Sequence, residues 1–252
     1  MIGRSGQAPL DQEIRDHLER VAYKSGSDRS TRYLGMISMA QVSTRRGEGE
    51  EPFAGLDPTR RTLQRYLSRS RGETLAWTAL ALGVLEEDAN ERGEVASPDS
   101  GRALRAALDK ARSYEVAGAL AIGLGMVHDP ESSEMLLARL NDASDMYMRG
   151  YCALALGMLG TPNAINPIRE AMAASTNQSF VVENAAIALA LLGDQGNGTR
   201  IFSLLDRSSN PKVQASVASA MGWIRDPRPL GDLCAMLADP RRRLVLERLY
   251  TS

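Results

Sequence analysis

Tyr151–Leu159 reads Tyr-Cys-Ala-Leu-Ala-Leu-Gly-Met-Leu, and this stretch of small and apolar residues decides the fold because it recurs along the chain. Three further segments align with it without gaps, each with glycine or alanine at the position of Gly157: Ala119–Val127, Asn184–Leu192 and Ser216–Ile224. Thr78–Leu85 matches well and Gly35–Val42 matches less well. The aligned positions are 40, 83, 125, 157, 190 and 222, so the intervals are 43, 42, 32, 33 and 32 residues.

A second kind of helix is expected between these segments. Its apolar residues recur three and four positions apart, which gives one buried stripe and one polar face, in Pro130–Leu140, Pro162–Met172 and Pro227–Leu237. The prolines stand at a first helical turn, where a missing N–H is tolerated. The residues before them are predicted to cap these helices with a side-chain oxygen: Asp129, Thr161 and Asp226. Pro167 falls one turn inside its helix and is predicted to loosen that start.

The two patterns define a unit of helix, short turn, helix and turn that is about 32 residues long. One such pair cannot bury its apolar face alone, so successive pairs stack into a continuous core, and the small residues let neighbouring second helices approach closely. We therefore predict an all-α fold, a right-handed α-solenoid of about six to seven antiparallel helix pairs, in a single domain over residues 1–252. The expected repeats lie near residues 10–43, 57–86, 99–127, 130–159, 162–192 and 195–224, with a partial unit at 227–250.

Two insertions, at residues 43–56 and 86–100, account for the longer first intervals. Both lie in the turn from a second helix to the next first helix, and their charged, polar composition predicts mobile loops. One interpretation is that the fold merely tolerates these loops, and the other is that they are functional. The partial unit at the end is either a polar cap or the start of a longer array.

These features resemble HEAT repeats, in the short form found in bilin-lyase-type HEAT-like proteins. The resemblance covers about residues 10–250, is strongest over 113–239, and implies a stack of helical hairpins. HEAT stacks serve mostly as binding scaffolds, so the resemblance implies binding more than any particular activity. It rests on Asp-Pro turns at 129–130, 226–227 and 239–240 and on Ala-Leu-Gly in second helices at 81–83 and 155–157.

Composition and motifs argue against several classes of function. A net charge of −1 excludes a chain that acts as a bulk polycation, and no window holds the roughly 20 apolar residues that span a bilayer. The N-terminal residues lack a secretory pattern, so a cytoplasmic location is expected. Cys152 and Cys234 are expected to be small buried groups, His17 an exposed helix residue and His128 a turn residue. We find no nucleophile elbow or Walker loop, and we predict no catalytic residue, cofactor or metal, and therefore no enzyme.

The strongest electrostatic feature is a run of arginines without intervening acids. Arg61, Arg65 and Arg69 fall within about 80° of one another on a helix. Such a stripe can bind an acidic partner, a phosphate or a nucleic-acid backbone. The alternative is a solvated outer face whose charges pair with acids of the nearby insertion: Glu48, Glu50 and Glu51.

The early positions of the second helices carry aromatic, arginine and polar residues that are typical of interface anchors, although some of these positions face the core. We predict that a protein or peptide partner binds Arg32, Tyr114, Tyr147, Arg149, Phe180 and Gln214. The predicted function is a non-enzymatic scaffold that mediates protein–protein interaction through the concave helix face of the stack. One alternative is a nucleic-acid-binding protein similar to HEAT-like DNA glycosylases, which the net charge argues against. The other, a bilin lyase or chaperone, follows from the repeat type alone.

Overall fold

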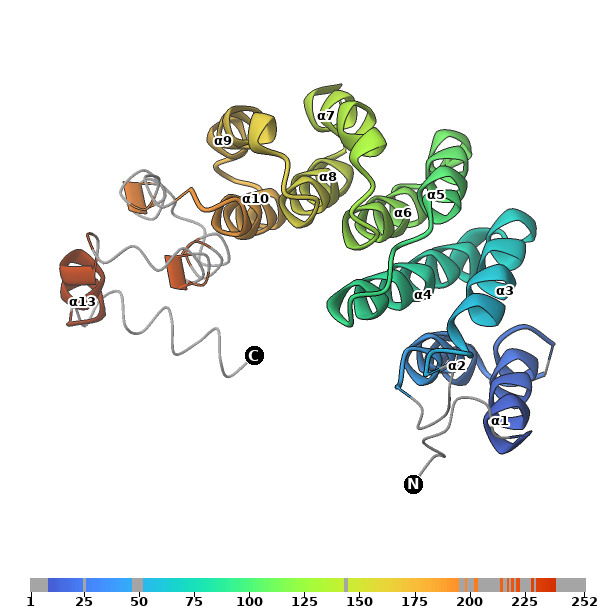
Figure 1. The fold of residues 1–252 in the computed structure, drawn as a ribbon. Coiled ribbons are helices and arrows are strands. Elements are labelled where there is room, and N and C mark those ends of the chain that lie inside the picture. Colours follow the sequence, from blue (N-terminus) through green and yellow to red (C-terminus); the bar gives the residue numbers. More distant parts are fainter. Residues whose placement is uncertain are drawn as a thin grey trace. The chain divides into compact units, whose positions relative to one another are not determined.

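The computed structural model describes residues 9–24, 26–46, 52–142, 145–194 and 230–238, together with single positions between 198 and 228. Every element in this part of the chain is helical (Figure 1). The chain divides into two compact units, Met1–Ser132 and Ser133–Ser252. Within each unit the helices pack neighbour to neighbour, as in a helical solenoid, which confirms the predicted all-α stack. The single domain and the repeat boundaries stay predictions.

The described part of the first unit consists of three helix pairs, α1 with α2, α3 with α4 and α5 with α6. A π-helical turn, Arg20–Lys24, extends α1 toward α2. The second helices pack on one another, α2 on α4 and α4 on α6, and the first helix α3 packs on α5. The bounds are α1 Pro9–Glu19, α2 Arg29–Ser43, α3 Leu56–Arg69, α4 Gly72–Glu91, α5 Pro98–Lys110 and α6 Tyr114–Met126.

In the second unit, α7 pairs with α8 and α9 pairs with α10, while α8 packs on α10 and α7 on α9. A 3₁₀ turn precedes each first helix: Pro130–Ser132 before α7 and Pro162–Ala164 before α9. The helix bounds are α7 Ser133–Asp142, α8 Met146–Met158, α9 Ile165–Ala174, α10 Ser179–Leu191 and α13 Leu230–Ala238. Most of the predicted units 195–224 and 227–250, with their turns at 226–227 and 239–240, lies outside the described residues.

The small residues of the second helices allow the close approach that their pattern predicts. A Cβ atom on Gly83 of α4 would lie 3.2 Å from the Cα of Gly123 on α6. A Cβ atom on Gly157 of α8 would lie only 2.5 Å from the Cα of Ala188 on α10. At these distances a larger side chain would force the backbones apart, so the prediction is confirmed.

The prediction that Asp129 and Thr161 cap the following helices with their side chains is wrong. The carboxylate of Asp129 accepts a hydrogen bond from Arg105, and only its backbone oxygen accepts one from the amide of Ser132, at 3.1 Å. The Thr161 hydroxyl lies 3.1 Å from the hydroxyl of Ser133. Both turns begin with 3₁₀ geometry, in which a backbone oxygen can satisfy an amide that a side chain would otherwise cap.

Pro167 fits its helix better than its place in the sequence suggested. Because residues 162–164 form a 3₁₀ turn, the α-helix begins only at Ile165. Pro167 therefore lies in the first turn of α9, where the amide that proline lacks would have no partner within the helix. The expectation that Pro167 loosens the start of its helix is therefore corrected: the proline fits the first turn of α9.

The insertion at 86–100 is not the mobile polar loop that its composition predicted. Helix α4 continues into it as far as Glu91, and Glu86 is fully buried. The Glu86 carboxylate accepts hydrogen bonds from Arg60 Nε (2.7 Å) and Nη2 (2.8 Å), from the Ser100 hydroxyl (2.5 Å) and from the Ser97 amide (3.3 Å). A buried carboxylate needs such partners, and here they fasten the insertion to α3 and α5. Residues 47–51 of the other insertion lie outside the described part.

Candidate functional site

In the first unit, aromatic side chains gather on the first two turns of the second helices. The rings of Tyr33 on α2 and Trp77 on α4 stack with centroids 5.0 Å apart and 9° between their planes. The Tyr33 hydroxyl donates a hydrogen bond to Glu73 (2.5 Å), and Arg29 lies 3.5 Å from the same carboxylate. The hydrogen bond to this carboxylate raises the pKa of Tyr33. The pair is thus held in one orientation, with a charged rim beside it.

The second unit repeats this arrangement on α8 and α10. The ring of Phe180 lies 5.1 Å from that of Tyr147 and 5.0 Å from that of Tyr151. Gly150 makes room for it, because a Cβ atom there would lie 2.6 Å from the Phe180 ring. Two predicted residues, Tyr147 and Phe180, are therefore brought together.

Sequence reasoning missed two members of these clusters, Trp77 and Tyr151. Each lies one helical turn after a residue at the start of its second helix, Glu73 for Trp77 and Tyr147 for Tyr151. A spacing of four residues places both members of such a pair on one face of a helix. That spacing was the signal that could have found them.

The two predicted arginines contact neighbouring helices. Arg32 donates from Nε to the backbone oxygen of Ala22 (3.2 Å) and from Nη2 to the Thr74 hydroxyl (3.5 Å), which joins α2 to the π-helical turn and to α4. Arg149 donates from Nη1 to the hydroxyl of Ser175 (3.2 Å), at the end of α9. Tyr114, at the start of α6, is 42% exposed, whereas Gln214 is half-buried. The assignment of these residues to a partner stays a prediction.

The predicted stripe on α3 is exposed at all three arginines: Arg61, Arg65 and Arg69. Arg65 lies 3.2 Å from Glu19 on α1 and stands over the ring of Tyr66, 5.2 Å from its centroid. The acids proposed to neutralise the stripe, at positions 48, 50 and 51, lie outside the described residues. Arg65 is therefore tied to α1, and the binding role of the stripe stays untested.

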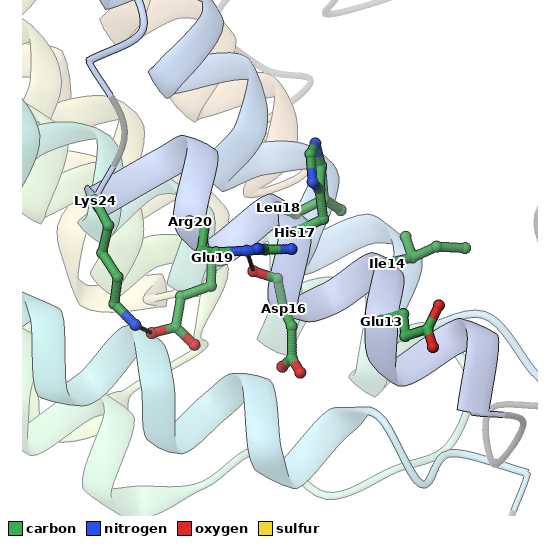
Figure 2. A pocket seen from close by; sticks show the side chains of 8 residues that line it. All are labelled: Glu13, Ile14, Asp16, His17, Leu18, Glu19, Arg20 and Lys24. Atoms are coloured by element: carbon green, nitrogen blue, oxygen red, sulfur yellow. Dashed lines mark hydrogen bonds and ion pairs between the residues drawn. The ribbon is translucent and has the colours of Figure 1, made fainter.

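A surface hollow of about 850 Å³ runs beside α1 (Figure 2). Within the described residues its wall comes from one stretch of chain, α1 and the π-helical turn, and carries charges of both signs. Lys24 lies 3.3 Å from Glu19, and Arg20 bonds the backbone oxygen of Asp16 at 3.4 Å. Some of these charged groups already bind groups of the chain itself, and both signs are present. The hollow therefore does not favour a ligand of either charge. It is lined by Glu13, Ile14, Asp16, His17, Leu18, Glu19, Arg20 and Lys24.

The cysteines and histidines occupy mostly the places predicted. Cys152 is buried, His17 is exposed on α1 and His128 lies in a turn. Cys234 is exposed, contrary to the prediction, because it lies on the face of α13 that also carries the exposed Gly231, Ala235 and Ala238. Among the residues that the structure describes, no three His, Cys, Asp or Glu side chains lie close enough to hold a metal ion.

Residues 101–190, which span α5 to α10, match the family model for HEAT repeats. This part of the chain therefore consists of HEAT repeats. HEAT repeats generally serve as scaffolds for protein interaction, so the match agrees with a binding role and does not identify a partner. No curated protein matches the sequence. Among the described helices, none has the length and hydrophobicity that a transmembrane segment requires.

Proposed function

We propose that this protein is a non-enzymatic scaffold that binds another protein or a peptide through the first two turns of its second helices. One observation carries the proposal. In each unit, partly exposed aromatic rings from neighbouring second helices pack on one another, Tyr33 with Trp77 and Tyr147 with Phe180 and Tyr151. Large rings held on rigid helices are typical anchors of protein interfaces.

The contacts around these rings favour a preformed binding surface. A ring that already stacks on its neighbour loses little conformational freedom when a partner covers it, so more of the contact energy appears as affinity. The rim beside Tyr33 combines an acid and a base, Glu73 and Arg29, which can confer specificity on the partner. The apolar centre and polar rim together resemble the composition of a protein interface.

The alternatives from the sequence gain no comparable support. A DNA-binding surface needs cations directed at phosphates, whereas Arg32 and Arg149 donate to groups of their own chain. A bilin lyase or chaperone rests on the repeat type alone. Binding without catalysis is therefore the function that we propose.

A photo-crosslinking experiment tests the proposal. Benzoylphenylalanine replaces Tyr114, which is exposed at the start of a second helix, and in a control it replaces Arg102, whose side chain is 71% exposed on the first helix α5. We expect a discrete adduct with a partner from position 114 only. The purified partner should then bind Tyr33→Ala and Phe180→Ala variants at least about tenfold more weakly than the parent protein. Equal adducts from both positions, or unchanged affinity in both variants, would contradict the proposal.

A further inference from the structure

The first helices α3 and α5, which pack side by side (Figure 1), leave a groove of about 410 Å³ between them. Its floor is apolar and shallow. Alanines of α5 at positions 103, 106 and 107 line it, together with Ala111 just after α5, Leu67 of α3 and Leu75 of α4. The larger apolar residues of α5, Leu104 and Leu108, are fully buried instead. Because most residues of α5 that line the groove are alanines, the space between the two helices is not filled by the chain itself.

Positive charge surrounds one end of this groove. Arg71 and Lys110 line it, and both are exposed. Two further exposed cations are next to lining residues in the sequence: Arg69 at the end of α3 and Arg112 in the turn after α5. Within the described part of the chain, no carboxylate is paired with any of these four cations.

The contrast with the other end of the same helices is informative. There Arg60 bonds the buried Glu86, Arg102 pairs with Asp99, and Arg105 bonds Asp129. The fold thus pairs Arg60, Arg102 and Arg105 with acids, whereas no acid of the described residues is paired with the cations beside the groove. A ligand with carboxylates next to apolar groups would satisfy both the cations and the alanine floor.

We propose that the α3–α5 groove docks an acidic amphipathic segment of a partner protein, separately from the second-helix aromatic surface. The apolar side chains of the segment lie on the alanines, and its carboxylates pair with Arg71 and Lys110. The small floor residues let a helical segment approach closely, as in other complexes where a helix occupies an apolar groove. On the rim, the Ser70 hydroxyl offers hydrogen bonds to its polar groups, and the Ser68 hydroxyl, which already donates to the backbone oxygen of Arg65 (2.8 Å), can accept one. Nucleic acid fits less well, because a phosphate backbone has no apolar groups to cover the floor.

The test uses a fluorescent, amidated peptide of about 20 residues that repeats Leu-Glu-Glu-Leu-Leu-Glu-Glu, a pattern that places leucine on one helical face, and measures its binding by anisotropy. A matched peptide has glutamine in place of glutamate. We expect the acidic peptide to bind the full chain and the glutamine peptide to bind at least about tenfold more weakly, with the difference reduced by salt.

Two variants test the two halves of the site. Arg71→Glu with Lys110→Glu reverses the charges, and Ala106→Phe fills the groove at an exposed alanine without changing charge. Each should weaken binding of the acidic peptide by about tenfold or more, whereas Arg102→Glu, which changes a charge on the far end of α5, should alter it less than about twofold.

Three results would overturn the proposal. The first is that the acidic peptide does not bind up to about 1 mM, and the second is that the glutamine peptide binds equally well. The third is that Arg71→Glu/Lys110→Glu and Arg102→Glu change the affinity for the acidic peptide equally. Binding of dodecanoate without binding of the peptide would assign the groove to a small carboxylate, and binding of a DNA duplex in its place would assign it to nucleic acid. Because the crosslinking at Tyr114 probes a second helix, its failure would be distinguishable from failure here.

Discussion

At the scale of single residues, Gly157 shows how tightly the second helices pack. A Cβ atom there would lie 2.5 Å from the Cα and 2.8 Å from the Cβ of Ala188, atoms that cannot rotate away. We expect Gly157→Ala to lower the free energy of unfolding by about 1–3 kcal/mol in urea titrations, because α8 and α10 must separate. Gly231 of α13 has nothing within 4 Å, so Gly231→Ala is the control and should be neutral or stabilising by up to about 1 kcal/mol. If the two variants changed the free energy of unfolding equally, the close contact between α8 and α10 at Gly157 would not be the cause of the loss.

His128 has a left-handed backbone conformation, and the equivalent positions after α8 and α10 carry glycine. Its φ is 51°, and Gly160 and Gly193, two residues past the ends of α8 and α10, have φ of 70° and 72°. Its imidazole Nε2 lies 2.8 Å from the carboxylate of Glu87, which is a contact that glycine cannot make.

Two substitutions separate these effects of His128. His128→Gly relieves the left-handed backbone and should raise the free energy of unfolding by up to about 1 kcal/mol in urea titrations. His128→Ala keeps the strain and loses the contact with Glu87, so it should lower stability. If His128→Gly is less stable than the parent protein, the contact with Glu87 outweighs the strain and the prediction is wrong.

At the scale of helices, arginines on first helices bind acids near the ends of second helices. The pairs are Arg60 with Glu86, Arg105 with Asp129, and Arg169 with Asp194. The side chains of Glu86, Asp129 and Asp194 are less than a tenth exposed. These pairs tie the two helices of a repeat together at the turn that leads to the next repeat.

This pairing also explains what the sequence could and could not predict. The helix pairs and the close approach at Gly157 follow from spacing, because apolar and small residues repeat with the helical period. The burial of Glu86 does not, because its partner Arg60 stands 26 positions away and no local pattern links them. Charged residues are mostly exposed, so composition alone predicted a loop there. In the candidate site, the positions of Tyr147 and Phe180 at the starts of second helices identified both residues, but the contact between their rings depends on which helices are neighbours.

Glu86→Gln tests the strongest of these pairs while keeping the size of the side chain. We expect it to lower the free energy of unfolding by about 3 kcal/mol, because Arg60, with its side chain 11% exposed, loses a charged partner in a buried place. Asp99→Asn in the same insertion removes an exposed pair with Arg102 and should cost less than about 1 kcal/mol. Both are measured by urea titration. A loss for Glu86→Gln no larger than that for Asp99→Asn would show that the buried pair does not hold the insertion.

At the scale of the whole molecule, the two compact units raise the question of whether they open separately. The stability of a repeat protein is approximately a sum over repeats and their nearest-neighbour interfaces, so a local change acts mainly on nearby repeats. Cys152 is a natural reporter for the second unit, because it is buried on α8 and burial raises the pKa of its thiol to about 12. It reacts as a thiolate only when the structure around it opens.

We expect a thiol reagent such as DTNB at about pH 8 to label the exposed Cys234 rapidly and Cys152 slowly. In a Cys234→Ser background, Gly157→Ala should speed labelling of Cys152 by about five- to 150-fold, since the opening equilibrium follows the loss of about 1–3 kcal/mol in stability. Glu86→Gln, in the first unit, should change this rate by less than about twofold, although it costs as much stability. Equal acceleration by the two variants would mean that the chain opens as one cooperative body and that its division into units has no thermodynamic counterpart.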